Sequence, residues 1–225
     1  MSLTVYEDLE QGSPEWLLAR CGILTASNVG SLLTPTLKIA SSETSRAIQR
    51  LLTAERITGH VEEVFVSADM ERGMFDEPLA RDLYSTTYAP VTELGFMVRE
   101  IDGYKLGYSP DGLVGEDGLI EIKSRKQKIH LKTILDDSVP TENMAQIQAG
   151  LLVSGREWCD YLSYCGGMPM YRIRVLPDPA WQEAIIGALA AFETQSAIWV
   201  DEYLTRTEGL PSTERIDHFG VELKL

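Results

Sequence analysis

The sequence predicts a mixed α/β protein in which helices flank a central mixed β-sheet. Apolar residues recur at helical spacing in four segments, residues 43–58, 69–88, 141–155 and 179–203. Strand-like alternation instead marks residues 91–100, 104–108, 158–165 and 170–175, with a predicted hairpin after the second of these segments. This order of helices and strands favours helices packed on a sheet. The chain has 225 residues, enough for one domain with a substantial core, so we predict a single domain over residues 1–225.

The N-terminal third is predicted to be helical. Ser13-Pro14 is typical of a helix start, and Gly22 suits the end of the same helix. A second helix should begin at the cap formed by residues 25–28, and the Thr-, Ser- and Pro-rich residues 34–42 predict a loop. Pro78 lies inside the pattern of residues 69–88 and predicts a kink or a late start there.

The most informative segment is a predicted hairpin. It has the sequence Ser-Pro-Asp-Gly-Leu at residues 109–113, a turn signal at residues 116–118 and Leu-Ile-Glu-Ile-Lys at residues 119–123. Strand side chains alternate between faces, so Glu121 and Lys123 should project together. The isoleucines between them should then point into a core.

Pairing across this hairpin brings Asp111 roughly opposite Ile122. Asp111, Glu121 and Lys123 would then surround one point, which could hold Mg²⁺ and activate water. The carbonyl of Ile122 could add a ligand, and Lys123 could stabilise charge on a phosphoryl oxygen. The alternative is an ordinary surface hairpin with a Glu–Lys pair.

Three further places supply candidate site residues. Glu77 could complete a metal site from its helix, although a solvent-facing charge is the alternative. Gln146 and Gln148 face differently on one helix, so one can line a site while the other binds backbone or solvent. Arg20 and Ser27 lie where a guanidinium, a hydroxyl and a helix start could form a phosphate pocket, with plain capping as the alternative.

The charge distribution bears on nucleic-acid binding. The net charge of −14 argues against nonspecific DNA binding. A local exception follows the hairpin, where the basic cluster comprises Lys123, Arg125, Lys126, Lys128 and Lys132. If DNA is the substrate, its backbone should be met there. A solvated basic helix is the alternative.

Three cysteines cannot all pair internally, and we expect reduced thiols. No apolar run is long enough to span a bilayer, and the N-terminus is polar and acidic, unlike a secretory signal. We therefore expect a soluble, cytoplasmic protein.

Together these segments resemble the phage lambda exonuclease, or YqaJ-like viral recombinase, branch of the PD-(D/E)xK nucleases. Five motifs match in order, at residues 20–27, 72–77, 109–113, 121–123 and 144–148. The resemblance implies a restriction-endonuclease-like core with its motifs at about 16–175. The C-terminal helix and tail, about 179–225, match no motif.

The resemblance also implies an activity. Members of this family digest one strand of linear double-stranded DNA from its 5′-phosphate end, release mononucleotides and leave 3′ single-stranded tails. They need Mg²⁺ or Mn²⁺ and act in homologous recombination with a single-strand annealing protein. A toroidal homotrimer is implied, as is a phage or bacterial origin with a cytoplasmic location.

The resemblance assigns roles residue by residue. The implied metal ligands are Asp111, Glu121, the carbonyl of Ile122 and Glu77. Lys123 would activate the nucleophilic water, positioned by Gln146. The implied 5′-phosphate and DNA contacts are Arg20, Ser27, Ser109 and Gln148.

Three alternatives stay open on the sequence. The first is an endonuclease or a structure-selective nuclease on the same core, and the second is a noncatalytic DNA-end-binding recombination scaffold. The third is a metal-free hydrolase that uses two carboxylates. The family places a basic residue and an apolar wedge near residues 34–42, where this chain has only Lys38. How a duplex end would be split is therefore open.

Overall fold

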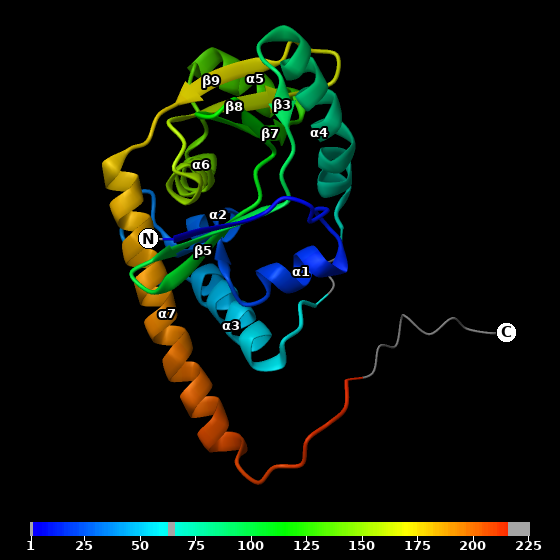
Figure 1. The fold of residues 1–225 in the computed structure, drawn as a ribbon. Helices are drawn as coiled ribbons and strands as arrows, with labels where there is room; N and C mark the ends of the chain where they lie inside the picture. Colours follow the sequence, from blue (N-terminus) through cyan, green and yellow to red (C-terminus); the bar gives the residue numbers. More distant parts are fainter. Residues whose placement is uncertain (1, 63–65, 216–225) are drawn as a thin grey trace, which may run out of the picture.

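The computed structural model describes residues 2–62 and 66–215 and has a mixed α/β fold (Figure 1). The predicted fold class is confirmed. The strands, however, form two mixed sheets where one was expected, with orders β1-β4-β5-β2 and β3-β6-β7-β8-β9. The division arises because the chain leaves the first sheet after β5 and enters the second at β6.

The first sheet consists of β1 (Ser2–Tyr6), β4 (Phe96–Ile101), β5 (Tyr104–Tyr108) and β2 (Leu24–Thr25). β4 pairs antiparallel with both β1 and β5, whereas β2 runs parallel to β5. Strand β1 was not predicted, because all five of its residues are exposed and none marks a buried face. β1 is identified as a strand by its pairing with β4.

The second sheet consists of β3 (Val91–Thr92), β6 (Gly112–Val114), β7 (Gly118–Ser124), β8 (Trp158–Tyr164) and β9 (Tyr171–Val175). The predicted hairpin is β6–β7, and β8 runs parallel to β7. Gly118, expected in the turn, instead begins β7. A Cβ atom at Gly118 would lie 2.2 Å from the Trp158 ring, so this position needs glycine for packing.

Seven helices lie within the described residues. They are α1 (Pro14–Arg20), α2 (Ala26–Val29), α3 (Glu43–Thr58), α4 (Ala68–Thr87), α5 (Gln127–Asp136), α6 (Thr141–Ser154) and α7 (Pro179–Thr207). The side chain of Ser13 caps α1 as predicted. Helix α4 begins before Pro78 and continues through it, so the proline does not delay its start.

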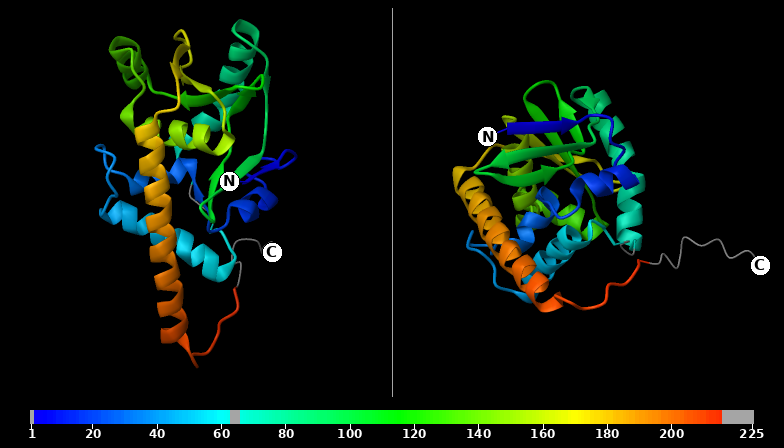
Figure 2. Two further views of the ribbon diagram at one scale, coloured as in Figure 1. Left: turned by 60° about the vertical axis from the view of Figure 1, so that its left-hand side comes forward. Right: turned by 60° about the horizontal axis from the view of Figure 1, so that its bottom comes forward.

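Two apolar cores hold the layers together. Helix α4 covers one face of the second sheet, where Ala80 and Tyr84 pack with Ile120 and Ile122. The predicted inward direction of these isoleucines is therefore confirmed. Helix α6 packs on the other face and contributes to a larger core shared with the first sheet and α7 (Figures 1 and 2).

Helix α7 is the longest helix and runs along the outside, past α6 and α3 (Figure 2). No helix in the described ranges is long and apolar enough to cross a membrane. All three cysteines are free, and Cys159 and Cys165 are buried packing residues.

Candidate active site

The candidate site lies where the two sheets meet. β5 ends at Tyr108 in the first sheet, and β6 begins at Gly112 in the second. The segment Ser109-Pro110-Asp111 bridges them. Ser109 therefore directly follows the last residue of β5 in the first sheet, and Asp111 directly precedes the first residue of β6 in the second.

Asp111 contacts the free edge of β7. Its Oδ2 accepts a hydrogen bond of 2.6 Å from the backbone N–H of Ile122. The β6–β7 pairing stops at Gly112 and Ile120, so no β6 residue is paired with Ile122. The N–H and C=O of one strand residue point to the same edge, so the Ile122 carbonyl also faces Asp111. The predicted proximity of Asp111 to Ile122 is confirmed.

Glu121 is fully buried and forms an ion pair with Lys123. The Nζ atom of Lys123 lies 2.6 Å from its Oε1, as expected from strand alternation. Beyond this ion pair, no described residue donates a hydrogen bond of standard geometry to either carboxylate oxygen of Glu121. A buried carboxylate in this state is costly unless a further partner binds it.

Lys123 also connects the hairpin to α6. Its ammonium donates a hydrogen bond of 3.1 Å to Oε1 of Gln146. Gln146 therefore joins the group, as predicted. Gln146 and Glu121 together fix the direction of the Lys123 side chain.

The carboxylates hold their protons more tightly than usual. Burial raises the pKa of Glu121 to about 7, with a further contribution from the charge of Asp111. Burial also raises the pKa of Asp111, although Lys123 opposes this. Burial would lower the pKa of Lys123, but Glu121 and Asp111 outweigh it, so the pKa is raised. A protonated lysine thus stands beside carboxylates that favour an added cation.

Helix α4 brings Glu77 to the side of Asp111. Burial, followed by the charge of Asp111, raises the pKa of Glu77 to about 7. Arg81 lies one turn further on and places Nη2 2.5 Å from Oε1 of Glu77. Its Nε donates to the backbone carbonyl of Asp111 at 2.8 Å. The sequence analysis missed Arg81, although its i, i+4 spacing from Glu77 was a usable signal.

These residues fit a hard divalent cation. Mg²⁺ is typically bound by one or two carboxylates and keeps several waters and substrate oxygens. Asp111, Glu121 and the Ile122 carbonyl match that donor set, and the unsatisfied oxygens of Glu121 favour it. Within residues 2–62 and 66–215 no three acidic, His or Cys side chains converge on one point. Glu77 is held by Arg81 and does not join the other two carboxylates here.

A second polar group gathers around Ser109. Its Oγ accepts hydrogen bonds from Trp16 Nε1 at 2.9 Å and from Arg20 Nη1 at 3.5 Å. The Arg20 guanidinium lies 3.8 Å from the centre of the Trp16 ring. Burial lowers the pKa of Arg20 to about 10, partly offset by Glu55, so the side chain stays charged at neutral pH. The expected proximity of Arg20 and Ser109 is confirmed.

Ser27 lies at the same end of the first sheet. Thr25 pairs with Gly107 in parallel register, so Ser27 and Ser109 each follow this pair by two residues. Ser27 is exposed, and the hydrogen bond that its hydroxyl forms among the described residues is with the hydroxyl of Thr25, at 3.0 Å. Its hydroxyl is therefore available to a ligand.

Gln148 does not reach this site. It is fully buried, and its amide donates to the carbonyl of Leu176 at 2.8 Å while accepting from the N–H of Asp178, also at 2.8 Å. Both ends of the amide are used by the backbone that leads into α7. The expected DNA contact of Gln148 is thus replaced by a structural role. The expected division of roles between Gln146 and Gln148 is observed.

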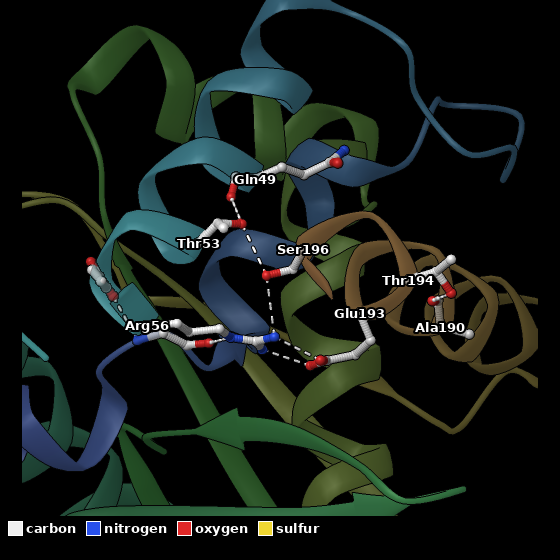
Figure 3. Close-up of polar contacts among 9 residues, drawn as sticks. Gln49, Thr53, Arg56, Ala190, Glu193, Thr194 and Ser196 are labelled. Atoms are coloured by element: carbon white, nitrogen blue, oxygen red, sulfur yellow. Dashed lines mark hydrogen bonds and ion pairs between the residues drawn. The ribbon is translucent and has the colours of Figure 1, made fainter. Parts of the chain in front are cut away.

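A clamp between α3 and α7 holds the turn after Arg20 (Figure 3). Arg56 binds both carboxylate oxygens of Glu193 at 2.7 Å and donates from Nε to the Gly22 carbonyl at 2.6 Å. Glu55 accepts from the Gly22 N–H at 2.8 Å. Gly22 has φ +67°, and a Cβ atom there would lie 2.4 Å from Arg56 Cγ. Only glycine fits this turn. Gly22 lies two residues after Arg20, which is the last residue of α1.

The YqaJ-like viral recombinase domain model matches residues 15–157, which include every candidate site residue that the sequence predicted. The chain belongs to the YqaJ-like viral recombinase family. The resemblance stated from the motifs is therefore confirmed. No curated protein sequence matches the chain.

Solved structures support this family assignment. The alkaline exonuclease LHK-Exo from Laribacter hongkongensis is 34% identical, with a TM-score of 0.76, covering 87% of this chain and 98% of its own. LHK-Exo in complex with dAMP is 32% identical, with a TM-score of 0.78, covering 88% and 100%. A phage-related exonuclease from Haemophilus somnus 129PT is 10% identical, with a TM-score of 0.61, covering 80% and 96%. This last likeness concerns the fold alone.

Proposed function

We propose that this chain is a metal-dependent DNA exonuclease that degrades one strand of linear duplex DNA from its 5′-phosphate end. The carrying observation is the buried, unsatisfied carboxylate of Glu121 beside Asp111 and Lys123. A buried carboxylate pair with a neighbouring ammonium suits phosphodiester hydrolysis. The family assignment and the similarity to alkaline exonucleases support the same activity.

The 5′-end polarity rests on the group around Ser109. Arg20, Ser27 and Ser109 offer a guanidinium and two hydroxyls, a chemistry suited to a terminal phosphate. Only Pro110 separates Ser109 from Asp111. A phosphate held at Ser109 would therefore set the next phosphodiester against Asp111 and Glu121, by positioning alone.

Hydrolysis would transfer the hydroxide of a water to phosphorus and break the bond from phosphorus to O3′ of the terminal nucleotide. When bound by Asp111, Glu121 and the Ile122 carbonyl, Mg²⁺ or Mn²⁺ supplies Lewis-acid polarisation and a more acidic water. The raised pKa of Lys123 keeps it protonated. We therefore assign Lys123 to stabilising phosphoryl charge and orienting the water, with Gln146 fixing its direction.

This bond cleavage leaves a 5′-phosphate on the remaining strand. The new end has the same chemistry as the one that was bound, so it can enter the Arg20 group in turn. Repeated release of mononucleotides would give 3′ single-stranded tails. A toroidal homotrimer and a single-strand annealing partner in recombination belong to this proposal through the family resemblance.

The test is digestion of 5′-phosphorylated linear, 5′-hydroxyl linear and closed circular duplex, each with Mg²⁺ and with excess EDTA. We expect mononucleotides from the phosphorylated linear duplex, slower digestion of the hydroxyl form and an intact circle, all dependent on Mg²⁺. Cutting of the circle would identify an endonuclease. Full activity in EDTA would favour a metal-free hydrolase, and end binding without digestion would favour a scaffold.

Two variants assign the groups separately. Asp111→Asn should abolish digestion of every substrate. Arg20→Gln should remove the preference for a 5′-phosphate, so that the two linear substrates are digested at nearly equal rates. An Arg20→Gln enzyme that kept the full preference would contradict the pocket assignment.

A further inference from the structure

A basic cleft lies at the end of β7, beyond the candidate active site. It has a volume of about 560 Å³ between α4, the start of α5 and the turn after β8. Its charged lining residues are Arg72, Asp76, Arg125, Lys126 and Lys128. Four basic residues and one acidic residue therefore line this cleft, in a chain whose net charge is −14. A local concentration of positive charge on an acidic protein suits an anionic ligand.

The single acid in this cleft is already engaged. Asp76 accepts a hydrogen bond of 2.6 Å from the hydroxyl of Ser124, which also accepts one from Arg72 Nε at 3.0 Å. Asp69, outside the lining, pairs with Arg72 at 2.7 Å and Lys126 at 2.9 Å. These contacts hold the cations around the end of β7.

The cleft continues the strand that carries the candidate catalytic residues. The N–H of Arg125 bonds to the Tyr164 carbonyl at 2.7 Å, so pairing with β8 extends past Lys123. Strand alternation then puts Arg125 on the face of Glu121 and Lys123, roughly 7 Å further along. Its guanidinium reaches Asn143 of α6, one turn before Gln146. Arg125 is thus a lining residue of the cleft that also lies in line with the active-site residues of β7.

The predicted basic cluster is divided by the structure. Lys123 belongs to the active site, and Arg125, Lys126 and Lys128 line the cleft together with Arg72, which the sequence had not linked to them. Lys132 pairs with Asp136 on an exposed part of α5 and does not line the cleft. Lys128 forms no ion pair with any described residue and is exposed.

We infer that this basic cleft binds internal backbone phosphates of the DNA substrate, separately from the terminal-phosphate group at Arg20. The inference rests on the proposed function for the identity of the polyanion. Arg20 and Ser109 lie at the end of the first sheet, and the cleft lies at the carboxyl end of β7 in the second. The DNA backbone is therefore held on both sides of Asp111 and Glu121.

The test measures DNA affinity in EDTA, where the proposed reaction does not proceed. Binding of 5′-phosphorylated and 5′-hydroxyl duplex is followed by fluorescence anisotropy over a range of salt concentrations. The slope of log affinity against log salt is negative, and each lost phosphate contact reduces its magnitude by about 0.9. Lys128→Gln should therefore reduce the magnitude by about 0.9, and Lys126→Gln with Lys128→Gln by about 1.8. Affinity should fall several-fold, equally for both kinds of end.

Lys105→Gln is the matched control, because Lys105 is exposed on β5 and lies outside the cleft. It removes the same charge and should leave the slope unchanged. Thermal unfolding verifies that each variant is folded, since surface ion pairs such as Lys126–Asp69 contribute little to stability. A double variant with the slope of Lys105→Gln would overturn the inference.

A parallel Mg²⁺ digestion keeps the two proposals apart. If wild-type protein fails to digest DNA, the proposed function fails while the slope still tests the cleft. If wild-type protein digests DNA and the double variant matches the control in slope, only the cleft assignment fails.

Discussion

Glu121 and Asp160 are both fully buried acids on neighbouring strands of one sheet, yet their surroundings are opposite. Asp160 faces α4 and accepts hydrogen bonds from Tyr84 at 2.7 Å, from Arg172 at 3.1 Å and from two nitrogens of Arg174 at 2.8 and 2.9 Å. Glu121 faces α6 with an ion pair and no hydrogen bond from the described residues.

The pKa values follow this difference. Burial tends to raise the pKa of Asp160, but the bonds from Arg174 and Tyr84 outweigh it and lower the pKa. Burial raises the pKa of Glu121 to about 7. A buried acid whose oxygens are all bonded is part of the structure. A buried acid that keeps unsatisfied acceptor capacity marks a place where a ligand can bind.

The largest expected effect is on activity at Glu121. Glu121→Gln removes a ligand charge while keeping the shape, so digestion should fall roughly a thousandfold or more, the size of several kcal/mol of lost transition-state stabilisation. Stability without metal should stay the same or rise, because the raised pKa of Glu121 means that its charged form is disfavoured in the folded state even beside Lys123. Single-turnover digestion and thermal unfolding in EDTA measure the two effects. A strongly destabilised variant would make Glu121 a structural acid like Asp160.

The next effect is on stability at Asp160. Asp160→Asn should lower the free energy of unfolding by about 2 kcal/mol, because Arg172, Arg174 and Tyr84 lose a charged acceptor. The DNA digestion rate of the folded variant should be unchanged. Urea unfolding provides the measurement, with Asp136→Asn as the control, since its pair with Lys132 is exposed. A control that lost as much stability as Asp160→Asn would contradict the comparison.

Gln146 and Gln148 allow the same comparison, between a site residue and a structural residue, for uncharged side chains. Gln148→Ala should cost about 2 kcal/mol of stability because it removes a buried side chain and its two hydrogen bonds to the backbone, and should spare the digestion rate. Gln146→Ala should leave stability nearly unchanged and slow digestion about tenfold through misdirected Lys123. Urea unfolding and single-turnover digestion, run on both variants, give the answer. Equal effects from both variants would remove the distinction.

The smallest effect is the pH dependence of stability, which should have opposite signs at the two acids. In EDTA, the raised pKa of Glu121 means the folded state holds its proton more tightly than the unfolded chain. Its contribution is therefore present below about pH 4 and lost as pH rises toward 7. The stability gain of Glu121→Gln should thus grow from pH 5 to 8.

The lowered pKa of Asp160 gives a contribution present above about pH 4 and lost as pH falls below it. The stability difference between wild type and Asp160→Asn should therefore shrink from pH 5 to 3. Urea unfolding at each pH measures both trends. Parallel trends for the two variants would show that the acids do not differ as described.

The local part of the site was predictable because strand alternation and a short turn depend on neighbouring residues alone. Those rules place Glu121 with Lys123 and bring Asp111 to Ile122. The roles of other residues depend on contacts with segments that are far away in the sequence. Gln148 binds backbone at Leu176 and Asp178, which no spacing rule connects to it. The division into two sheets depends on the direction that the chain takes at Ser109-Pro110-Asp111, and β1 has no buried face to reveal it.

The residue at which the family model ends affects how the protein can be truncated. The family model ends at residue 157, just before β8, which pairs along the whole length of β7. Beyond it lie Asp160, the Gln148 contacts and Glu193 of the clamp on Gly22. A fragment cut at that boundary would keep every motif residue but expose the strand of Glu121 as a sheet edge. The segment that the family model covers is thus smaller than the cooperative unit that keeps those residues in place.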